Sequence, residues 1–176
     1  MIYHKDIING DDVSYLRYLY KSMPMVHHSQ YHNLFNISIS NISPSFHSPP
    51  WNTIQNKLRE YYISLNFEQQ LLPAVITNYF LTYEVGSYAI MHQDNPNSIQ
   101  LSAITLIGRS DILEGGDLIV MTKDSLGKEK VPEVVIFPRD GHTVSYTTND
   151  HGVSRVFTGK RVVLVSWFRR LNNENN

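Results

Sequence analysis

After Pro73 the chain reads Ala74-Val-Ile-Thr-Asn-Tyr-Phe-Leu-Thr-Tyr-Glu84, a run rich in β-branched and aromatic residues. Such residues favour strands, and further runs of this kind follow, separated by turn signals such as Glu-Gly-Gly-Asp and Pro-Arg-Asp-Gly. The expected strands are 74–84, 98–107, 117–121, 131–137, 143–146, 151–157 and 161–169. This succession of short strands predicts a mainly antiparallel β-sandwich or barrel.

Two helices are expected ahead of these strands. Asp11 and Asp12 can cap a helix that extends to about Ser22, because apolar residues follow at helical spacing. A Pro-Pro pair precedes a second helix, which runs from Trp51 to about Asn66 with apolar residues at three- and four-residue steps. These helices would buttress the β-structure.

The segment 23–50 between the two helices is rich in Pro, His, Ser and Asn, and within it only 34–39 alternates like a strand. We expect a long polar loop, which is either simply solvated or a candidate lid over a functional site. The chain as a whole, 1–176, is expected to be one domain. Its parts would be helical support in 1–72, a β-barrel core in 73–170 and a frayed tail in 171–176.

Composition limits the classes of function. At 176 residues the chain suits one domain with a sizeable core, and its formal net charge of -1 predicts no binding to nucleic acid or to an anionic membrane. The absence of cysteine excludes disulfides and thiolate metal sites, so His and carboxylate are the remaining protein ligands for a metal. No signal peptide and no run of transmembrane length is evident, which predicts an intracellular, cytoplasmic protein.

The first candidate metal ligands are His92 and Asp94, one residue apart. In an extended chain side chains at i and i+2 point to the same face, so this imidazole and carboxylate would converge on one point. A third candidate, His151, follows downstream, ahead of Lys160 and Arg161 at the start of an apolar strand. Two His and one carboxylate with open coordination positions form the facial triad of non-haem Fe(II) oxygenases. The cation beyond them suggests a site for a carboxylate-bearing co-substrate.

The chemistry-bearing segments occur in a characteristic order. They are Tyr83-x-x-Gly86-x-Tyr88-x-x-x-His92-x-Asp94-Asn95-Pro96, Leu101–Leu106, Glu114–Leu118, Val135–Pro138, His151–Val153, Gly159–Arg161 and Ser166–Phe168. Taken together, they resemble the prolyl-4-hydroxylase-like family of 2-oxoglutarate/Fe(II) dioxygenases, and the Asp-Asn-Pro step resembles its prolyl hydroxylase branch. The resemblance covers roughly residues 75–170. It implies a double-stranded β-helix, a jelly-roll or cupin-like barrel, with N-terminal supporting helices.

The resemblance also implies roles for individual residues. Fe(II) would be bound by the catalytic residues His92, Asp94 and His151. The co-substrate 2-oxoglutarate would be bound by Arg161 and Tyr83. The pocket would be lined by Tyr88, Val153 and Trp167. Lys160 alternates with Arg161 and should point outward, away from the co-substrate.

Two assignments leave alternatives open. His142 is a rival for His151, because it also lies between the Phe-Pro strand and Arg161; the His-Gly-Val match and the shorter separation from Arg161 favour His151. The oxygen-sensing members of the family bind the co-substrate carboxylate with a tyrosine where this chain has Leu106. The second hydroxyl donor could then be Tyr83, Tyr79 or Thr143.

The activity implied by the resemblance is hydroxylation of an unactivated C–H with O2 and 2-oxoglutarate, which releases succinate and CO2, with ascorbate as a candidate reductant. A prolyl residue in a protein or peptide is the favoured substrate. One alternative is the same chemistry on a free amino acid, a small molecule or a nucleic-acid base, of which the base is disfavoured by the near-neutral charge. The other alternative is a non-catalytic β-barrel binding module. The sequence specifies neither the oligomeric state nor the substrate.

Overall fold

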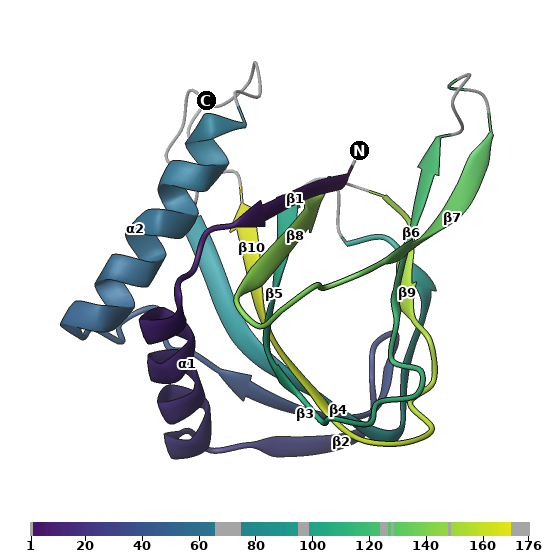
Figure 1. Cartoon of the computed structure of the whole chain (residues 1–176), viewed down its shortest axis with the longest axis horizontal. Helices are drawn as coiled ribbons and strands as arrows, with labels where there is room; N and C mark the ends of the chain where they lie inside the picture. Colours follow the sequence, from purple (N-terminus) through teal and green to yellow (C-terminus); the bar gives the residue numbers. More distant parts are fainter. Residues whose placement is uncertain are drawn as a thin grey trace, which may run out of the picture.

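A single antiparallel sheet, curled into a half-barrel, forms the body of the protein (Figure 1). The computed structural model describes residues 2–65, 75–94, 99–123, 127, 129–147 and 149–169. Its helices are α1 (Gly10–Ser22) and α2 (Pro49–Ser64). Its strands are β1 (Ile2–Asp6), β2 (Val26–Tyr31), β3 (Leu34–Asn41), β4 (Val75–His92), β5 (Ile99–Arg109), β6 (Leu118–Lys123), β7 (Lys130–Val135), β8 (His142–Tyr146), β9 (His151–Val153) and β10 (Arg161–Arg169). The predicted mainly β architecture with supporting helices is confirmed.

The strand order is β1-β8-β5-β10-β4-β9-β6-β7, and β3 joins β4 with β2 on its other side. The described strand pairs are antiparallel. β4 is longer than predicted and bends around the barrel: its first half pairs with β10, and its last residues pair with β9. One strand therefore connects the wall that carries Arg161 with the wall that carries His151.

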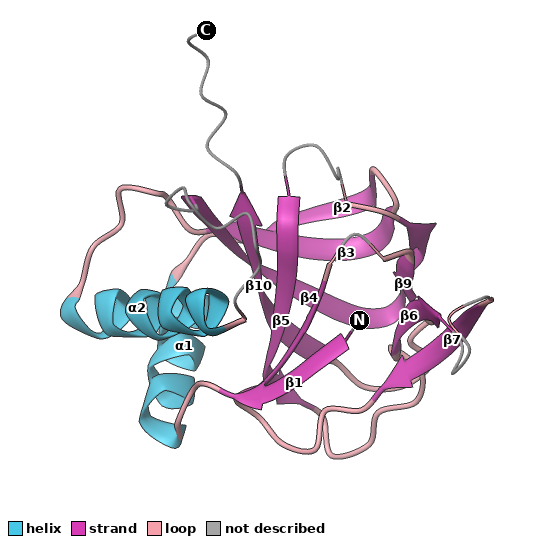
Figure 2. Cartoon of the chain, turned by 90° about the horizontal axis from the view of Figure 1, so that it is seen from above, coloured by secondary structure: helices cyan, strands magenta, loops and turns pink. Residues whose placement is uncertain are grey.

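The two faces of the sheet pack against different partners, as the alternation of side chains along a strand requires. On β10, Val163 and Val165 belong to the core inside the barrel, whereas Leu164 and Phe168 belong to a second core under the helices. Figure 2 shows both helices on one side of the barrel. Their contribution to this second core comes from apolar residues at helical spacing, which include Val13, Leu16, Leu19, Trp51, Ile54 and Leu58.

The helix starts follow from local capping. The side chain of Asn9, not Asp11, caps α1, because it accepts a hydrogen bond from the Asp12 amide while the Asp12 carboxylate accepts one from the Asn9 amide. Ser48 caps α2, and Pro49 occupies its first turn. Neither helix in the described part of the chain is long and apolar enough to cross a membrane.

The N-terminal third contains more strand than predicted. The segment 23–50 was expected to be a loop with one short strand, but β2 and β3 form an antiparallel hairpin that turns at residues 32–33. β2 is an edge strand with largely exposed side chains, so it lacks the apolar alternation that marks a half-buried strand. β1 was also missed, and it pairs with β8 at the far edge. The predicted tail 171–176 and the Asn95-Pro96 step lie outside the described residues.

Candidate metal and co-substrate site

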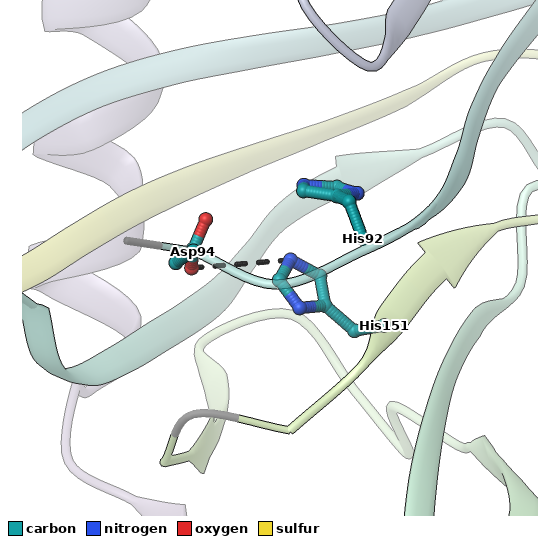
Figure 3. Close-up of side chains that lie close together, drawn as sticks. All are labelled: His92, Asp94 and His151. Carbon is teal, nitrogen blue, oxygen red and sulfur yellow. Dashed lines mark ion pairs between the residues drawn. The ribbon is translucent and has the colours of Figure 1, made fainter. Parts of the chain in front are cut away.

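The structure brings His92, Asp94 and His151 together (Figure 3). Each offers one ligand atom, and these atoms all lie within 4.8 Å of one another. His92 ends β4, Asp94 follows it, and His151 begins β9. His92 and His151 are direct partners in the β4–β9 pairing, which brings a distant part of the chain beside the local His-x-Asp pair.

Backbone carbonyls orient both imidazoles. The Nδ1 of His92 lies 2.7 Å from the carbonyl oxygen of Ile90, and the Nδ1 of His151 lies 3.1 Å from that of Asn149. A carbonyl can only accept, so each Nδ1 carries the proton and donates. In the neutral rings the Nε2 atoms keep their lone pairs. Hydrogen bonds of this kind fix the tautomer and ring orientation of metal-binding histidines.

The surroundings of the cluster favour a neutral His151 and a fixed Asp94. Burial lowers the pKa of His151; the Asp94 carboxylate acts in the opposite direction, and His92 lowers this pKa further. The Nε2 of His151 lies 3.9 Å from Oδ2 of Asp94. That same carboxylate oxygen accepts a hydrogen bond from the Ser102 hydroxyl on β5. A neutral imidazole and an anchored carboxylate are the forms that bind a divalent metal.

The rival histidine, His142, lies outside this cluster. It is the first residue of β8, and its Nδ1 lies 2.9 Å from a carboxylate oxygen of Asp6 on β1. Its Nε2 lies 3.2 Å from Nδ1 of His4. Both ring nitrogens therefore have partners in the β1–β8 pairing, which gives His142 a structural environment.

A cavity of about 850 Å³ opens beside the three ligands, and Arg161 lines it. The Arg161 side chain is buried, with 5% of the residue exposed, and its Nε has no hydrogen-bond partner among the described residues. Its guanidinium carbon lies 5.1 Å from the ring centroid of Tyr83 and 5.9 Å from that of Phe137. Burial lowers the pKa of Arg161, yet a guanidinium stays charged in proteins. A buried cation that faces a cavity without a counter-ion fits an anionic ligand.

Three buried phenols line the same cavity. Burial raises the pKa of Tyr83 to about 12, although the Arg161 charge acts the other way. Burial, and after it the Asp94 carboxylate, raises the pKa values of Tyr79 and Tyr146 well above the ordinary value. All three hydroxyls are therefore protonated at neutral pH and can donate hydrogen bonds to an anion.

Tyr146 was missed in the sequence. Its alternation with Val144 within a predicted strand was the available signal, since Val144 is a core residue of the barrel interior. Ser102 was missed as well. The available signal was its alternation with Ile104, which lines the cavity. Thr143, one of the three candidate donors, does not line the cavity, and its hydroxyl lies 2.8 Å from that of Thr105.

Of the three residues predicted to form the pocket wall, Val153 and Trp167 line the cavity and Tyr88 does not. The Tyr88 ring stacks on Phe35 at a centroid distance of 4.7 Å, and the Arg155 guanidinium carbon lies 4.5 Å from its centroid. Alternation counted back from His92 would place Tyr88 on the cavity face, but the β4–β9 register shifts between Ala89 and His92, so Ala89 lines the cavity instead. Part of β2 reaches the cavity too, through Val26, His28 and Tyr31.

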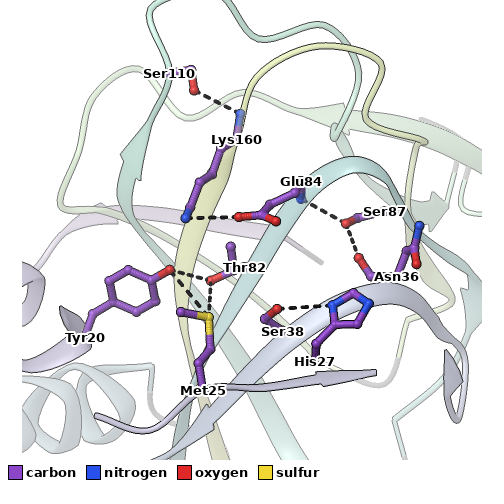
Figure 4. Close-up of polar contacts among 10 residues, drawn as sticks. All are labelled: Tyr20, Met25, His27, Asn36, Ser38, Thr82, Glu84, Ser87, Ser110 and Lys160. Carbon is purple, nitrogen blue, oxygen red and sulfur yellow. Dashed lines mark hydrogen bonds and ion pairs between the residues drawn. The ribbon is translucent and has the colours of Figure 1, made fainter. Parts of the chain in front are cut away.

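The outer face of the same strands has a different polar chemistry (Figure 4). Lys160 points outward as predicted, and its ammonium lies 3.1 Å from a carboxylate oxygen of Glu84. The Thr82 hydroxyl lies 2.9 Å from the Tyr20 hydroxyl, which comes from α1. These polar groups have protein partners, whereas the Nε of Arg161 has no hydrogen-bond partner within the described part of the chain.

No protein-family model matches the chain, and no curated protein is significantly similar to it in sequence. Solved structures are similar in fold. A prolyl-4-hydroxylase from Pseudomonas putida is 18% identical, with a TM-score of 0.74 over 97% of this chain and 93% of that one. The chain has the fold of the prolyl-4-hydroxylase-like 2-oxoglutarate oxygenases.

Two further structures support the same fold. One is a prolyl hydroxylase from Trichoplax adhaerens in complex with a peptide fragment of the hypoxia inducible factor oxygen degradation domain. It is 13% identical, with a TM-score of 0.68 over 95% of this chain and 83% of that one. The other is HygX from Streptomyces hygroscopicus with nickel and 2-oxoglutarate bound, 11% identical, with a TM-score of 0.71 over 97% of this chain and 83% of that one. The double-stranded β-helix expected from the sequence is thereby confirmed.

Proposed function

We propose that the protein is an Fe(II)- and 2-oxoglutarate-dependent dioxygenase that hydroxylates a prolyl residue in a protein or peptide and releases succinate and CO2. One observation carries the proposal. A His-Asp-His cluster borders the same cavity as the buried Arg161, whose Nε has no hydrogen-bond partner among the described residues. Either feature alone has a structural explanation, but together they match a metal and a dicarboxylate co-substrate bound side by side.

His92, Asp94 and His151 would hold the iron. The donor set of two neutral imidazole nitrogens and one carboxylate oxygen suits Fe(II), and three ligands leave open positions for other groups. The carbonyls of Ile90 and Asn149 would keep the Nε2 atoms directed at the metal. When bound, the iron supplies the oxidising power that the side chains of the protein lack.

Arg161 and the phenols would bind and orient 2-oxoglutarate. A guanidinium fork matches a carboxylate in geometry and charge, so Arg161 would take the distal carboxylate. Tyr83, whose ring lies beside that guanidinium, can donate its hydroxyl to the same group. Tyr146 also lines the cavity and is a second donor candidate, since this chain has Leu106 where the oxygen-sensing enzymes have a tyrosine. Val153 and Trp167 would exclude water from the reacting atoms.

A prolyl target is supported by the fold likeness to prolyl hydroxylases, one of which binds a peptide. The cavity is large enough to hold a co-substrate and part of a second molecule. The β2–β3 hairpin borders its opening with His28 and Tyr31, which is where a peptide would make contact. A free amino acid or small molecule remains the alternative target of the same chemistry.

The test is a turnover assay with Fe(II), 2-oxoglutarate and ascorbate, with and without a mixture of proline-rich peptides. We expect peptide-stimulated succinate release and a mass gain of one oxygen atom on a peptide. If free amino acids stimulate succinate release and peptides do not, the oxygenase chemistry stands and the substrate is a free amino acid. No succinate under any condition, together with no 2-oxoglutarate binding to the metal-loaded protein, would leave a non-catalytic binding module.

A further inference from the structure

The cavity holds a second guanidinium that the proposed chemistry does not use. We propose that Arg169, at the end of β10, binds a carboxylate of the substrate, so that the molecule to be hydroxylated carries an acidic group close to its target carbon. This inference rests on the proposed function. It narrows the substrate to acids, whether the carboxylate belongs to a free amino acid or to an acidic residue of a peptide.

Arg161 and Arg169 are too far apart to share one ligand. Both lie on the face of β10 that lines the cavity, together with Val163, Val165 and Trp167. At about 3.3 Å per residue, the eight steps between the two arginines span roughly 26 Å along the strand. A five-carbon dicarboxylate with one carboxylate on Arg161 and its other end at the metal has no further carboxylate to offer Arg169. The second arginine therefore faces the part of the cavity that remains for the substrate.

The metal cluster lies close to the Arg169 end of β10. Trp167 is the direct partner of Ser102 on β5, and the Ser102 hydroxyl donates to the Asp94 carboxylate. Arg169 follows Trp167 by two residues, roughly 6.6 Å along the strand on the same face. A carbon presented to the metal and a carboxylate on Arg169 can therefore belong to one amino-acid-sized group.

Among the described residues, no carboxylate forms an ion pair with Arg169. Its Nε is buried and has no hydrogen-bond partner in the described part of the chain. Its guanidinium carbon lies 5.4 Å from the ring centroid of Trp167, a contact that supplies no in-plane acceptor to the guanidinium. Buried donors without partners are costly, and a carboxylate is the group that satisfies a guanidinium fork.

Charge balance points the same way. Asp94 is the only carboxylate among the described residues that line the cavity. A divalent metal and Arg161 together offset Asp94 and a doubly charged 2-oxoglutarate. Arg169 then remains as an uncompensated cation beside the substrate space. An acidic substrate restores neutrality.

The test uses acetate as a minimal carboxylate and nuclear magnetic resonance as the readout. The protein is loaded with Zn(II), which does not turn over, and with saturating 2-oxoglutarate, which occupies Arg161. The chain has two tryptophans, so the two indole N–H signals can be compared. That of Trp167 reports on Arg169. That of Trp51, which belongs to the core between the helices and the sheet, serves as an internal reference. We expect a saturable shift of the Trp167 signal with acetate and none with neutral acetamide.

Matched variants identify the cation. Arg169→Gln should weaken acetate binding about tenfold or more, because it removes a charge-assisted pair, and Arg169→Lys should restore part of it. Arg155→Gln is the control: this arginine also lies over an aromatic ring, that of Tyr88, but it does not line the cavity. An acetate response that is unchanged in Arg169→Gln, or no response in the native protein, would overturn the inference.

The two sources of the carboxylate are separated with paired ligands. L-proline is compared with L-prolinamide, and a terminally blocked Pro-Asp peptide with its Pro-Asn counterpart. At least tenfold tighter binding of the acid in the first pair assigns a free amino acid, and in the second pair an acidic peptide. Binding of 2-oxoglutarate is measured separately by calorimetry. If it fails while acetate still binds at Arg169, the proposed co-substrate is wrong and the anion site stands.

Discussion

The inner and outer faces of β4 and β10 carry similar polar residues in different circumstances. On the outer face, Lys160 pairs with Glu84 and Thr82 pairs with Tyr20 (Figure 4). On the inner face, one residue away, Arg161 is buried and its Nε has no partner among the described residues. Because an unpartnered buried donor costs free energy, it persists in a native protein only where something else requires it. A buried polar group without a partner therefore points to a ligand only where it also borders a cavity, as Arg161 does; Ser40 and Trp51, whose Oγ and Nε1 also lack partners among the described residues, do not line it.

His151 lies in the ligand cluster and His142 lies outside it, so variants of these two histidines make the sharpest test of this contrast. His151→Ala removes a proposed metal ligand, and we expect succinate release to fall by more than about 100-fold, since even the loss of a supporting hydrogen bond costs 10–100-fold in metal sites. His142→Ala removes partners of Asp6 and His4 instead. It should keep turnover within a few-fold of the native value.

Both histidine variants are first checked for folding by circular dichroism and thermal unfolding. A slightly lower melting temperature is expected for His142→Ala, because the exposed side chains of Asp6 and His4 each lose their contact with the buried imidazole. An active His151→Ala beside an inactive but folded His142→Ala would reverse the ligand assignment.

The adjacent cations on β10 give the next largest contrast. Arg161→Ala removes the proposed partner of the distal carboxylate of 2-oxoglutarate, a charge-assisted pair worth about 1.5–3 kcal/mol. The apparent affinity for 2-oxoglutarate should therefore fall roughly 10- to 150-fold. Iron binding should change far less.

Lys160→Ala is the matched control on the outer face. Its pair with Glu84 is solvent-exposed, and such pairs contribute about 0–1 kcal/mol. We expect a 2-oxoglutarate affinity close to that of the native protein. Equal losses in the two variants would show that general positive charge, and not the buried fork, attracts the co-substrate.

Two serine hydroxyls allow a finer comparison. Ser102→Ala removes the hydrogen bond to Asp94, so we expect iron affinity to fall by about 10-fold, at the lower end of the range for outer-shell groups. Ser166→Ala removes a buried hydrogen bond of 2.7 Å to Asn78, away from the cavity. That variant should lose stability, by about 1 kcal/mol, but not iron affinity. Competition with a fluorescent chelator measures the metal affinity in both variants.

Local patterns made much of this site predictable. His92 and Asp94 converge because alternation along one strand is a local property. The predicted strands that follow Pro73 carry apolar residues on both faces. One face packs in the barrel interior, and the other packs in the core under the helices. The outward direction of Lys160 follows from the same alternation.

What the sequence left open depended on register between distant strands. Tyr146 faces the cavity because β8 pairs with β5 so that Tyr146 is opposite Ser102. Tyr88 faces away from the cavity because the register of β4 and β9 shifts between Ala89 and His92. β2 was missed because an exposed edge strand is held by backbone hydrogen bonds, which leave no apolar pattern in its side chains. These features come from pairings that no single stretch of sequence specifies.

The smallest expected effect is a pH dependence of stability that belongs to the contacts of Asp6 with Arg139 and His142. Hydrogen bonds from Arg139 and then His142 lower the pKa of Asp6 below its ordinary value of 3.8. A carboxylate whose pKa is lowered on folding stabilises the native state above the unfolded-state pKa, and this contribution is lost as the pH falls through the folded-state value. The melting temperature of the native protein should therefore decline more steeply below pH 3.8 than that of Asp6→Asn. Thermal unfolding across that range measures the difference, which should be small because Asp6 is exposed.

Turnover at neutral pH should be the same in both proteins, since Asp6 does not line the cavity. A loss of turnover in folded Asp6→Asn would mean that the Asp6 contacts and the metal site are coupled, and that pairing with a protein partner does not by itself separate structural from functional groups.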